Sequence, residues 1–196
     1  MPTRATSPAE PTIFFATQQD WEDWLAAEHE RTSTGVWIKM AKKSSGVQSI
    51  THPEALDVAL CYGWIDGQRL GFDDVYFLQR FVPRRRQSPW SQINIGKVQR
   101  LTDAGRMQPA GIAEVERAKA DGRWDRAYQS QRNAEVPPDL QAALDANPQA
   151  ADFFATLKGT NRFAVLYRIQ DAKRPETRAR RIATFVDMLA RGETLR

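Results

Sequence analysis

Residues 51–82 read THPEALDVALCYGWIDGQRLGFDDVYFLQRFV, and this stretch decides the fold that we expect. Thr51 is placed to cap a helix, Pro53 fits the first turn, and Glu54 can bond back to the cap. The residues that follow, 55–62, are apolar nearly all round. A helix of this kind is usually buried on more than one side, so we expect it to pack between other elements.

A β-hairpin is predicted after this helix, which ends at Gly63. Residues 64–70 and 75–82 are its strands, and residues 71–74 form the turn between them. The second strand has large side chains on both faces, so one face can pack on helices and the other on a neighbouring surface. Residues 36–40 are a further strand candidate, because three of the five are β-branched or aromatic.

The regions on either side add mainly helices. Residues 13–15 are a strand candidate, and a helix over residues 18–30 is indicated by Thr17 three positions before Asp20. From residue 139 onward the pattern is entirely helical. The helices expected there cover residues 139–146, 149–158, 161–173 and 176–191.

Length and composition indicate a globular protein. A chain of 196 residues suits one domain or two small ones. The single cysteine excludes an internal disulfide framework. No apolar run approaches the ~18 residues that a membrane span needs, and the first eleven residues, MPTRATSPAEP, lack the apolar core of a signal peptide. We expect a cytoplasmic protein without a transmembrane segment, whose first residues are a disordered tail.

Positive charge is concentrated in residues 80–106. This segment carries seven basic residues against one acid, whereas the whole chain has a net charge of +4. Ser88 is a candidate helix cap, with Pro89 at the first helical position. The free N–H groups and the dipole of a helix N-terminus attract an anion, and arginine binds carboxylate or phosphate with a planar fork.

This combination predicts an anion-binding or polar-ligand site. The candidate ligand-binding residues of the segment are Arg84, Arg85, Arg86, Ser88, Trp90, Asn94 and Lys97. Trp90 is included because it could stack on a ring or on an arginine. The alternative is a solvated strand end, in which some of the arginines pair with acids elsewhere in the fold.

Trp64 and Asp66 are two further candidates for ligand contact. They lie at the junction between the predicted helix and the hairpin, where Asp66 can act as an acid or base and Trp64 as a pocket wall. The alternative is that Asp66 satisfies N–H groups of a turn. Cys61 lies in an apolar helix and is expected to be a small buried hydrophobe rather than a nucleophile.

No standard catalytic or cofactor motif is present. The two histidines, His29 and His52, have no histidine or cysteine at metal-ligand spacing. There is no nucleophile elbow and no glycine-rich phosphate loop. We therefore name no catalytic residue, no metal site and no cofactor.

Four separated motifs resemble the bacterial YdeI/OmpD-associated family, also called bacteriocin-protection proteins. They are EALDVALCYGWIDGQ (54–68), QRFVPRRRQSPWSQIN (79–94), GRMQPAGIAEVERAKADGRW (105–124) and AKRPETRARRIATFVDMLARGE (172–193). The resemblance covers nearly the whole chain. Its N-terminal part is similar to the YjbR/CyaY-like group.

The resemblance implies an α+β fold in two parts. After a disordered tail over residues 1–12, residues 13–135 would form a two-layer sandwich, in which helices pack on a small antiparallel sheet. Residues 136–196 would form a helical OmpD-associated segment packed on it. The family name implies tolerance of bacteriocins or cationic antimicrobial peptides, and a porin partner in some members. It implies no catalytic residues.

Three functional hypotheses follow. The first is a non-enzymatic stress or bacteriocin-resistance protein that binds an anionic small molecule or a protein partner, such as one of the cell envelope, through a basic pocket. The second is nucleic-acid binding, for which the overall charge is modest and no known motif is present. The third is an enzyme with Asp66, Trp64, Arg84 and Asn94 in one pocket, which requires these side chains to converge in space.

Overall fold

The structure is a computed structural model that describes residues 10–131 and 133–195. It divides into two compact units. Of the described residues, the first unit contains 10–90 and 94–126, and the second contains 91–93, 127–131 and 133–195. The boundary predicted after residue 135 stays a prediction. Of the tail predicted over residues 1–12, residues 1–9 lie outside the described residues.

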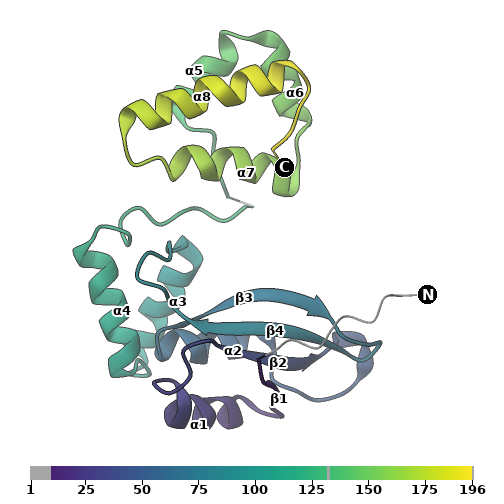
Figure 1. The fold of residues 1–196 in the computed structure, drawn as a ribbon, viewed down its shortest axis with the longest axis vertical. Helices are drawn as coiled ribbons and strands as arrows, with labels where there is room; N and C mark the ends of the chain where they lie inside the picture. Colours follow the sequence, from purple (N-terminus) through teal and green to yellow (C-terminus); the bar gives the residue numbers. More distant parts are fainter. Residues whose placement is uncertain (1–9, 132, 196) are drawn as a thin grey trace. The chain divides into compact units, whose positions relative to one another are not determined.

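The first unit is built around a four-stranded sheet (Figure 1). The strands are β1 (Thr12–Phe14), β2 (Val36–Ala41), β3 (Trp64–Gly71) and β4 (Tyr76–Pro83), in the order β1-β2-β4-β3. The hairpin of β3 and β4 is confirmed. The sheet is mixed rather than wholly antiparallel, because β1 pairs with β2 in parallel. A helix connects these two strands and returns the chain to the same end of the sheet.

Two capped helices pack on one face of this sheet. α1 (Gln18–Glu28) and α2 (His52–Cys61) each begin with a complete capping box, of Thr17 with Asp20 and of Thr51 with Glu54. The second box confirms the helix start predicted from the sequence. The ring of Trp21 in α1 lies 5.6 Å from that of Phe81 in β4, and its indole N–H donates to the Ala55 carbonyl in α2 at 3.0 Å.

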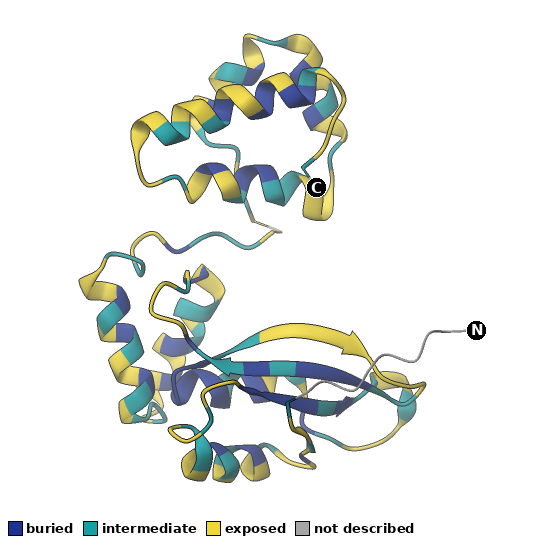
Figure 2. Cartoon of the chain, in the orientation of Figure 1, coloured by how far each residue is buried: buried dark blue, intermediate teal, exposed yellow. Residues whose placement is uncertain are grey.

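α3 (Gln92–Asp103) and α4 (Pro109–Ala120) follow the sheet. α4 crosses α2 at very short range, because a Cβ atom on Gly111 would lie 2.1 Å from the Cys61 carbonyl oxygen. Only glycine permits this approach of two backbones. Figure 2 shows the buried stripes along these helices.

Four helices form the second unit, as the sequence predicts. They are α5 (Pro138–Asp145), α6 (Pro148–Thr156), α7 (Gly159–Gln170) and α8 (Pro175–Ala190). Proline in the first turn starts α5, α6 and α8, where its missing N–H costs no hydrogen bond. The unit has its own core, to which α8 contributes Ile182, Phe185, Val186, Met188 and Leu189. The α+β fold with C-terminal helices is therefore confirmed.

Candidate functional site

The chain between β4 and α3 forms a turn rather than the start of a helix. The Ser88 hydroxyl accepts a hydrogen bond from the Arg85 N–H at 3.2 Å, and the Ser88 N–H donates to the Arg85 carbonyl at 2.9 Å. α3 begins only at Gln92. Ser91 pairs with Tyr128 in a β-bridge, which keeps this part of the chain extended. The prediction that Ser88 caps a helix is therefore wrong.

Arg84 and Trp90 are parts of the protein's interior. The Arg84 guanidinium stacks on the Trp90 ring at 3.7 Å and donates from Nη2 to the Pro89 carbonyl at 3.1 Å. Arg84 is 7% exposed and Trp90 is 2% exposed. The ring of Trp124 packs against that of Trp90 at 5.0 Å. These contacts hold the turn together and leave neither side chain open to a ligand in this conformation.

Lys97 is held by a carboxylate of α2. Its ammonium lies 2.5 Å from Asp57 Oδ1, and Arg100 contacts Asp57 Oδ2 at 2.7 Å. Burial acts to raise the pKa of Asp57, but the hydrogen bonds and charges of Lys97 and Arg100 outweigh it and lower that pKa below its ordinary value. Lys97 therefore neutralises the protein's own acid.

Two more cations of this segment are paired in the same way. Arg80 forms an ion pair with Glu10, and Arg106 contacts Glu22 at 3.1 Å. These contacts agree with the alternative interpretation of the basic segment, in which some of its arginines pair with acids elsewhere in the fold. Such pairing weakens the argument for nucleic-acid binding, since fewer charges remain for phosphates.

Arg85 and Arg86 are exposed, and Asn94 is half-buried. The predicted site required these side chains, Arg84 and the amides of a helix start to converge on one hollow. The structure does not bring them together, because Arg84 points onto Trp90 and the helix begins later. Anion binding at Arg85 and Arg86 stays a prediction.

Trp64 and Asp66 do not share a pocket either. The Trp64 ring lies in the aromatic core, 6.3 Å from the ring of Trp21 and 6.0 Å from that of Trp24. Asp66 Oδ2 lies 3.0 Å from His52 Nε2, in a partly exposed pair. Asp66 thus lies in β3 rather than in a turn, and its carboxylate contacts the first residue of α2.

This arrangement removes the catalytic pocket that the third hypothesis required. Trp64 faces the core, Asp66 faces His52, and Arg84 faces Trp90. Burial also raises the pKa of the Cys61 thiol to about 11, so this cysteine stays protonated and is not a nucleophile near neutral pH.

The first unit contains a different hollow, which we call the basic cavity. It has a volume of about 470 Å³ and lies between the ends of β2, β3 and β4, the loop after β2, and the start of α2. Its charged or titratable lining side chains are Lys42, Lys43, His52 and Arg69. Among the described residues, no aspartate or glutamate lines it. Met40 and Phe77 are among its apolar lining residues.

A β-bulge in β3 turns Arg69 towards this cavity. Asp66 pairs with Phe81 and Arg69 with Gln79, so β3 uses one residue more than β4 over the same length. Simple alternation from Asp66 would place Arg69 on the opposite face of the sheet. The bulge brings Arg69 to the face of Gln79 and Phe77, as bulges do when they re-aim a side chain.

Several contacts hold the cationic groups in place. The Arg69 guanidinium lies 3.7 Å from the centre of the Phe77 ring. Lys42 donates from its ammonium to the Asp73 carbonyl at 2.6 Å. The hydroxyl of Ser49 accepts from the Ala41 N–H at 2.9 Å and ties the loop to the end of β2. The cavity can therefore present several hydrogen-bond donors to one anion.

The basic cavity was not predicted from the sequence. The pair Lys42-Lys43 after a predicted strand is a signal that could have indicated it. Arg69 was not assigned to a site, because Gly67 within the predicted strand is compatible with a bulge but does not fix the face on which Arg69 lies. His52 was considered only as a metal ligand.

Among the described residues, no group of three or more His, Cys, Asp or Glu side chains is placed to hold a metal ion. No helix in this part of the chain is long and apolar enough to cross a membrane.

Comparison with known families gives two matches. A family described as bacteriocin-protection, YdeI or OmpD-associated matches residues 133–192, and a domain of unknown function (DUF8412) matches residues 13–114. No curated protein and no solved structure matches the chain. The likeness of the N-terminal part to the YjbR/CyaY-like group stays a prediction. The DUF8412 model covers more than half of the chain, which therefore belongs to that family. The resemblance to the YdeI/OmpD-associated family is confirmed over residues 133–192, which carry the helices expected for the C-terminal segment.

Proposed function

We propose that this chain acts in bacteriocin protection as a non-enzymatic binding protein, and that its first unit binds an anionic ligand in the basic cavity. The family match suggests the bacteriocin-related role. The cavity supports the binding role. The first functional hypothesis is thus kept, but its site moves from the arginine segment to Lys42, Lys43 and Arg69.

One observation carries this proposal: the cavity has cationic side chains and no acid among its described lining residues. In the arginine segment, by contrast, Lys97 and Arg106 are paired with carboxylates. Cations that lack a carboxylate partner and surround a hollow create a local positive potential, which attracts and holds an anion.

The apolar lining narrows the class of ligand. Met40 and Phe77 lie beside the cationic groups in the same cavity. A pocket with an apolar wall and a few convergent charged groups suits a small organic molecule rather than a bare ion. We therefore propose an organic phosphate or carboxylate with an apolar body.

The binding test is a calorimetric titration of the full chain with phenyl phosphate. We expect Arg69→Gln and Lys43→Gln each to weaken binding by about tenfold or more, because a hydrogen bond to a charged group contributes ~1.5–3 kcal/mol. Phenol, which lacks the charge, should bind far more weakly. Melting temperatures of the variants check that each one is folded.

The matched control is the double variant Arg85→Gln/Arg86→Gln, which removes two exposed charges outside the cavity. It should bind phenyl phosphate as the wild type does. If this double variant loses binding while Arg69→Gln keeps it, the site lies on the arginine segment and our assignment is wrong.

The bacteriocin-related role needs a test in cells. In a bacterial strain that lacks the gene, the wild-type protein should restore survival on bacteriocin, and Arg69→Gln at equal abundance should not. Restored survival with Arg69→Gln would show that protection does not depend on the basic cavity. No restoration by the wild type would contradict the protective role itself.

A further inference from the structure

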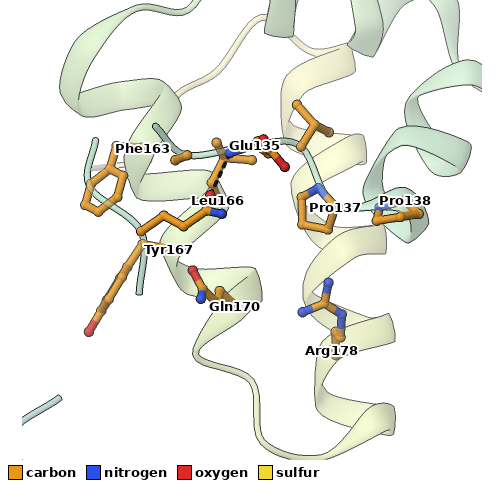
Figure 3. Close-up of a pocket in the computed structure, with 11 residues that line it drawn as sticks. Glu135, Pro137, Pro138, Phe163, Leu166, Tyr167, Gln170 and Arg178 are labelled. Atoms are coloured by element: carbon orange, nitrogen blue, oxygen red, sulfur yellow. Dashed lines mark hydrogen bonds between the residues drawn. The ribbon is translucent and has the colours of Figure 1, made fainter. Parts of the chain in front are cut away.

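The second unit contains a hollow of its own, which we call the aromatic cleft (Figure 3). Its volume is about 280 Å³. It is formed by Gln129 and residues 134–138, which precede and begin α5, together with residues of α7 and α8. It lies wholly within the second unit, so its description depends on no contact with the first.

Aromatic rings from α7 form one wall of the cleft. Phe163 and Tyr167 project from successive turns, with ring centres 5.8 Å apart and planes tilted by 34°. Tyr128 packs edge-on against Tyr167 at 5.2 Å, which helps to hold that ring in place. The face of an aromatic ring carries partial negative charge and attracts a cation placed over it.

Glu135 gives the cleft a carboxylate. Its backbone N–H donates to the Gln129 side-chain oxygen at 2.9 Å, which holds the loop in place (Figure 3, dashed line). Glu135 is exposed, and its carboxylate makes no ion pair with any described residue. Gln170 is another polar residue of the lining.

The one basic side chain that lines the described part of the cleft, Arg178, is already neutralised. Its Nε and Nη2 donate to the two carboxylate oxygens of Asp139 at 2.5 and 2.8 Å. Its Nη1 donates to the Ile169 carbonyl at 3.1 Å. Since Arg178 is paired with Asp139, Glu135 is the charged lining residue in the described part of the cleft for which no ion pair is seen.

We propose that the aromatic cleft binds one positively charged side chain, arginine or lysine, of a peptide. The rings of Phe163 and Tyr167 would lie against the cation and its alkyl stem, and Glu135 would supply the opposite charge. The volume is below the range of pockets that hold drug-sized ligands, and a single long side chain suits it. This proposal rests on the second unit and is independent of the anion site.

The test is a two-dimensional NMR titration of the full, isotopically labelled chain. The probe is the tripeptide acetyl-Gly-Arg-Gly-amide, and its matched partner has citrulline, a neutral residue of nearly the same shape, in place of arginine. We expect the arginine peptide to shift the amide signals of Glu135, Phe163, Tyr167 and Gln170. The citrulline peptide should shift them at least about tenfold less at equal concentration.

Two variants separate binding from folding. Glu135→Gln removes only the charge of an exposed side chain and should weaken binding of the arginine peptide about tenfold, with an unchanged melting temperature. Asp152→Asn removes another exposed carboxylate of the same unit, away from the cleft, and should bind as the wild type does.

Three results would overturn the proposal. One is the absence of shifts at the cleft with the arginine peptide up to about 20 mM, where even a weak contact is visible. Another is equal binding of the citrulline peptide. The third is a loss of binding in Asp152→Asn as large as that in Glu135→Gln, which would show only a general attraction between unlike charges.

Discussion

Arg84 sends its guanidinium onto the ring of Trp90 and donates to the Pro89 carbonyl, while its neighbours Arg85 and Arg86 remain exposed. Three consecutive residues of one type thus have two different roles. The stacked arginine contributes to stability through a contact that water does not screen, and the exposed arginines contribute little to it.

We expect Arg84→Ala to lower the free energy of unfolding by ~2 kcal/mol, the size of a desolvated cation–π contact. Arg85→Ala should change it by less than ~0.5 kcal/mol, as most surface substitutions do. Urea unfolding followed by tryptophan fluorescence measures both values. Equal effects of the two substitutions would contradict the buried role of Arg84.

Asp57 predicts a dependence of stability on pH. Its pKa is lower in the folded chain than its ordinary 3.8, so its ionised form stabilises the fold. That contribution is present above pH 3.8 and is lost as the pH falls through the lowered pKa of Asp57. Asp57→Asn should therefore reduce the loss of stability in acid, which unfolding curves at several pH values measure.

The control for this pH dependence is Asp152→Asn, at an exposed position. This variant should lose stability in acid to the same extent as the wild type. An unchanged profile in Asp57→Asn would mean that the ion pairs with Lys97 and Arg100 do not contribute to stability. The sequence showed these cations but not their common acid, because Asp57 lies 40 residues before Lys97 and only the fold brings them together.

At the scale of elements, the helices were easier to predict than their exact packing. The capping box at Thr51 is a local signal, and the structure has the helix start that it indicates. The bulge in β3 and the parallel pairing of β1 depend on partner strands, which local sequence patterns do not reveal. The start of α3 was predicted wrongly because Ser91 pairs with Tyr128, a residue distant in sequence.

The close crossing of α2 and α4 can be tested by a substitution at Gly111. Gly111→Ala would place a Cβ atom 2.1 Å from the Cys61 carbonyl oxygen, so the helices must separate. We expect a loss of ~1–3 kcal/mol, typical of overpacking. Thermal unfolding followed by circular dichroism measures the loss.

Gly96→Ala is the matched control, because Gly96 lies in α3 and a Cβ atom added there would have open space within 4 Å in the described part of the chain. In an open helical position alanine should stabilise by ~0.5–1 kcal/mol relative to glycine. If Gly111→Ala were as harmless as Gly96→Ala, the close crossing would not exist in solution.

At the scale of the whole molecule, the second unit has a core made by its own helices. We therefore expect a fragment of residues 127–196 to unfold cooperatively on heating. A fragment of residues 136–196, which starts at the boundary predicted from the sequence, should be less stable because it lacks Tyr128 and its contacts with Phe163 and Tyr167. Circular dichroism distinguishes the two fragments, and equal melting curves would favour the predicted boundary.

Neither proposed site was predicted from the sequence, and the physical reason is the same for both. Lys42 and Lys43 line one cavity with Arg69, which comes from another strand, and Glu135 of a loop lines one cleft with Tyr167 of α7. The basic segment was conspicuous because its charges are adjacent in the chain, yet four of its cations pair with acids far away in sequence. Adjacency in sequence is therefore a poor guide to a local positive potential.

The most direct measurement of the central claim is a crystal structure of the full chain with phenyl phosphate. We predict electron density for the ligand in the basic cavity, with its phosphate within hydrogen-bonding distance of Arg69 and Lys43. The claim that the anion binds in the basic cavity would be contradicted by density beside Arg85 and Arg86. It would also be contradicted by an empty cavity in crystals of a protein that binds the ligand in solution.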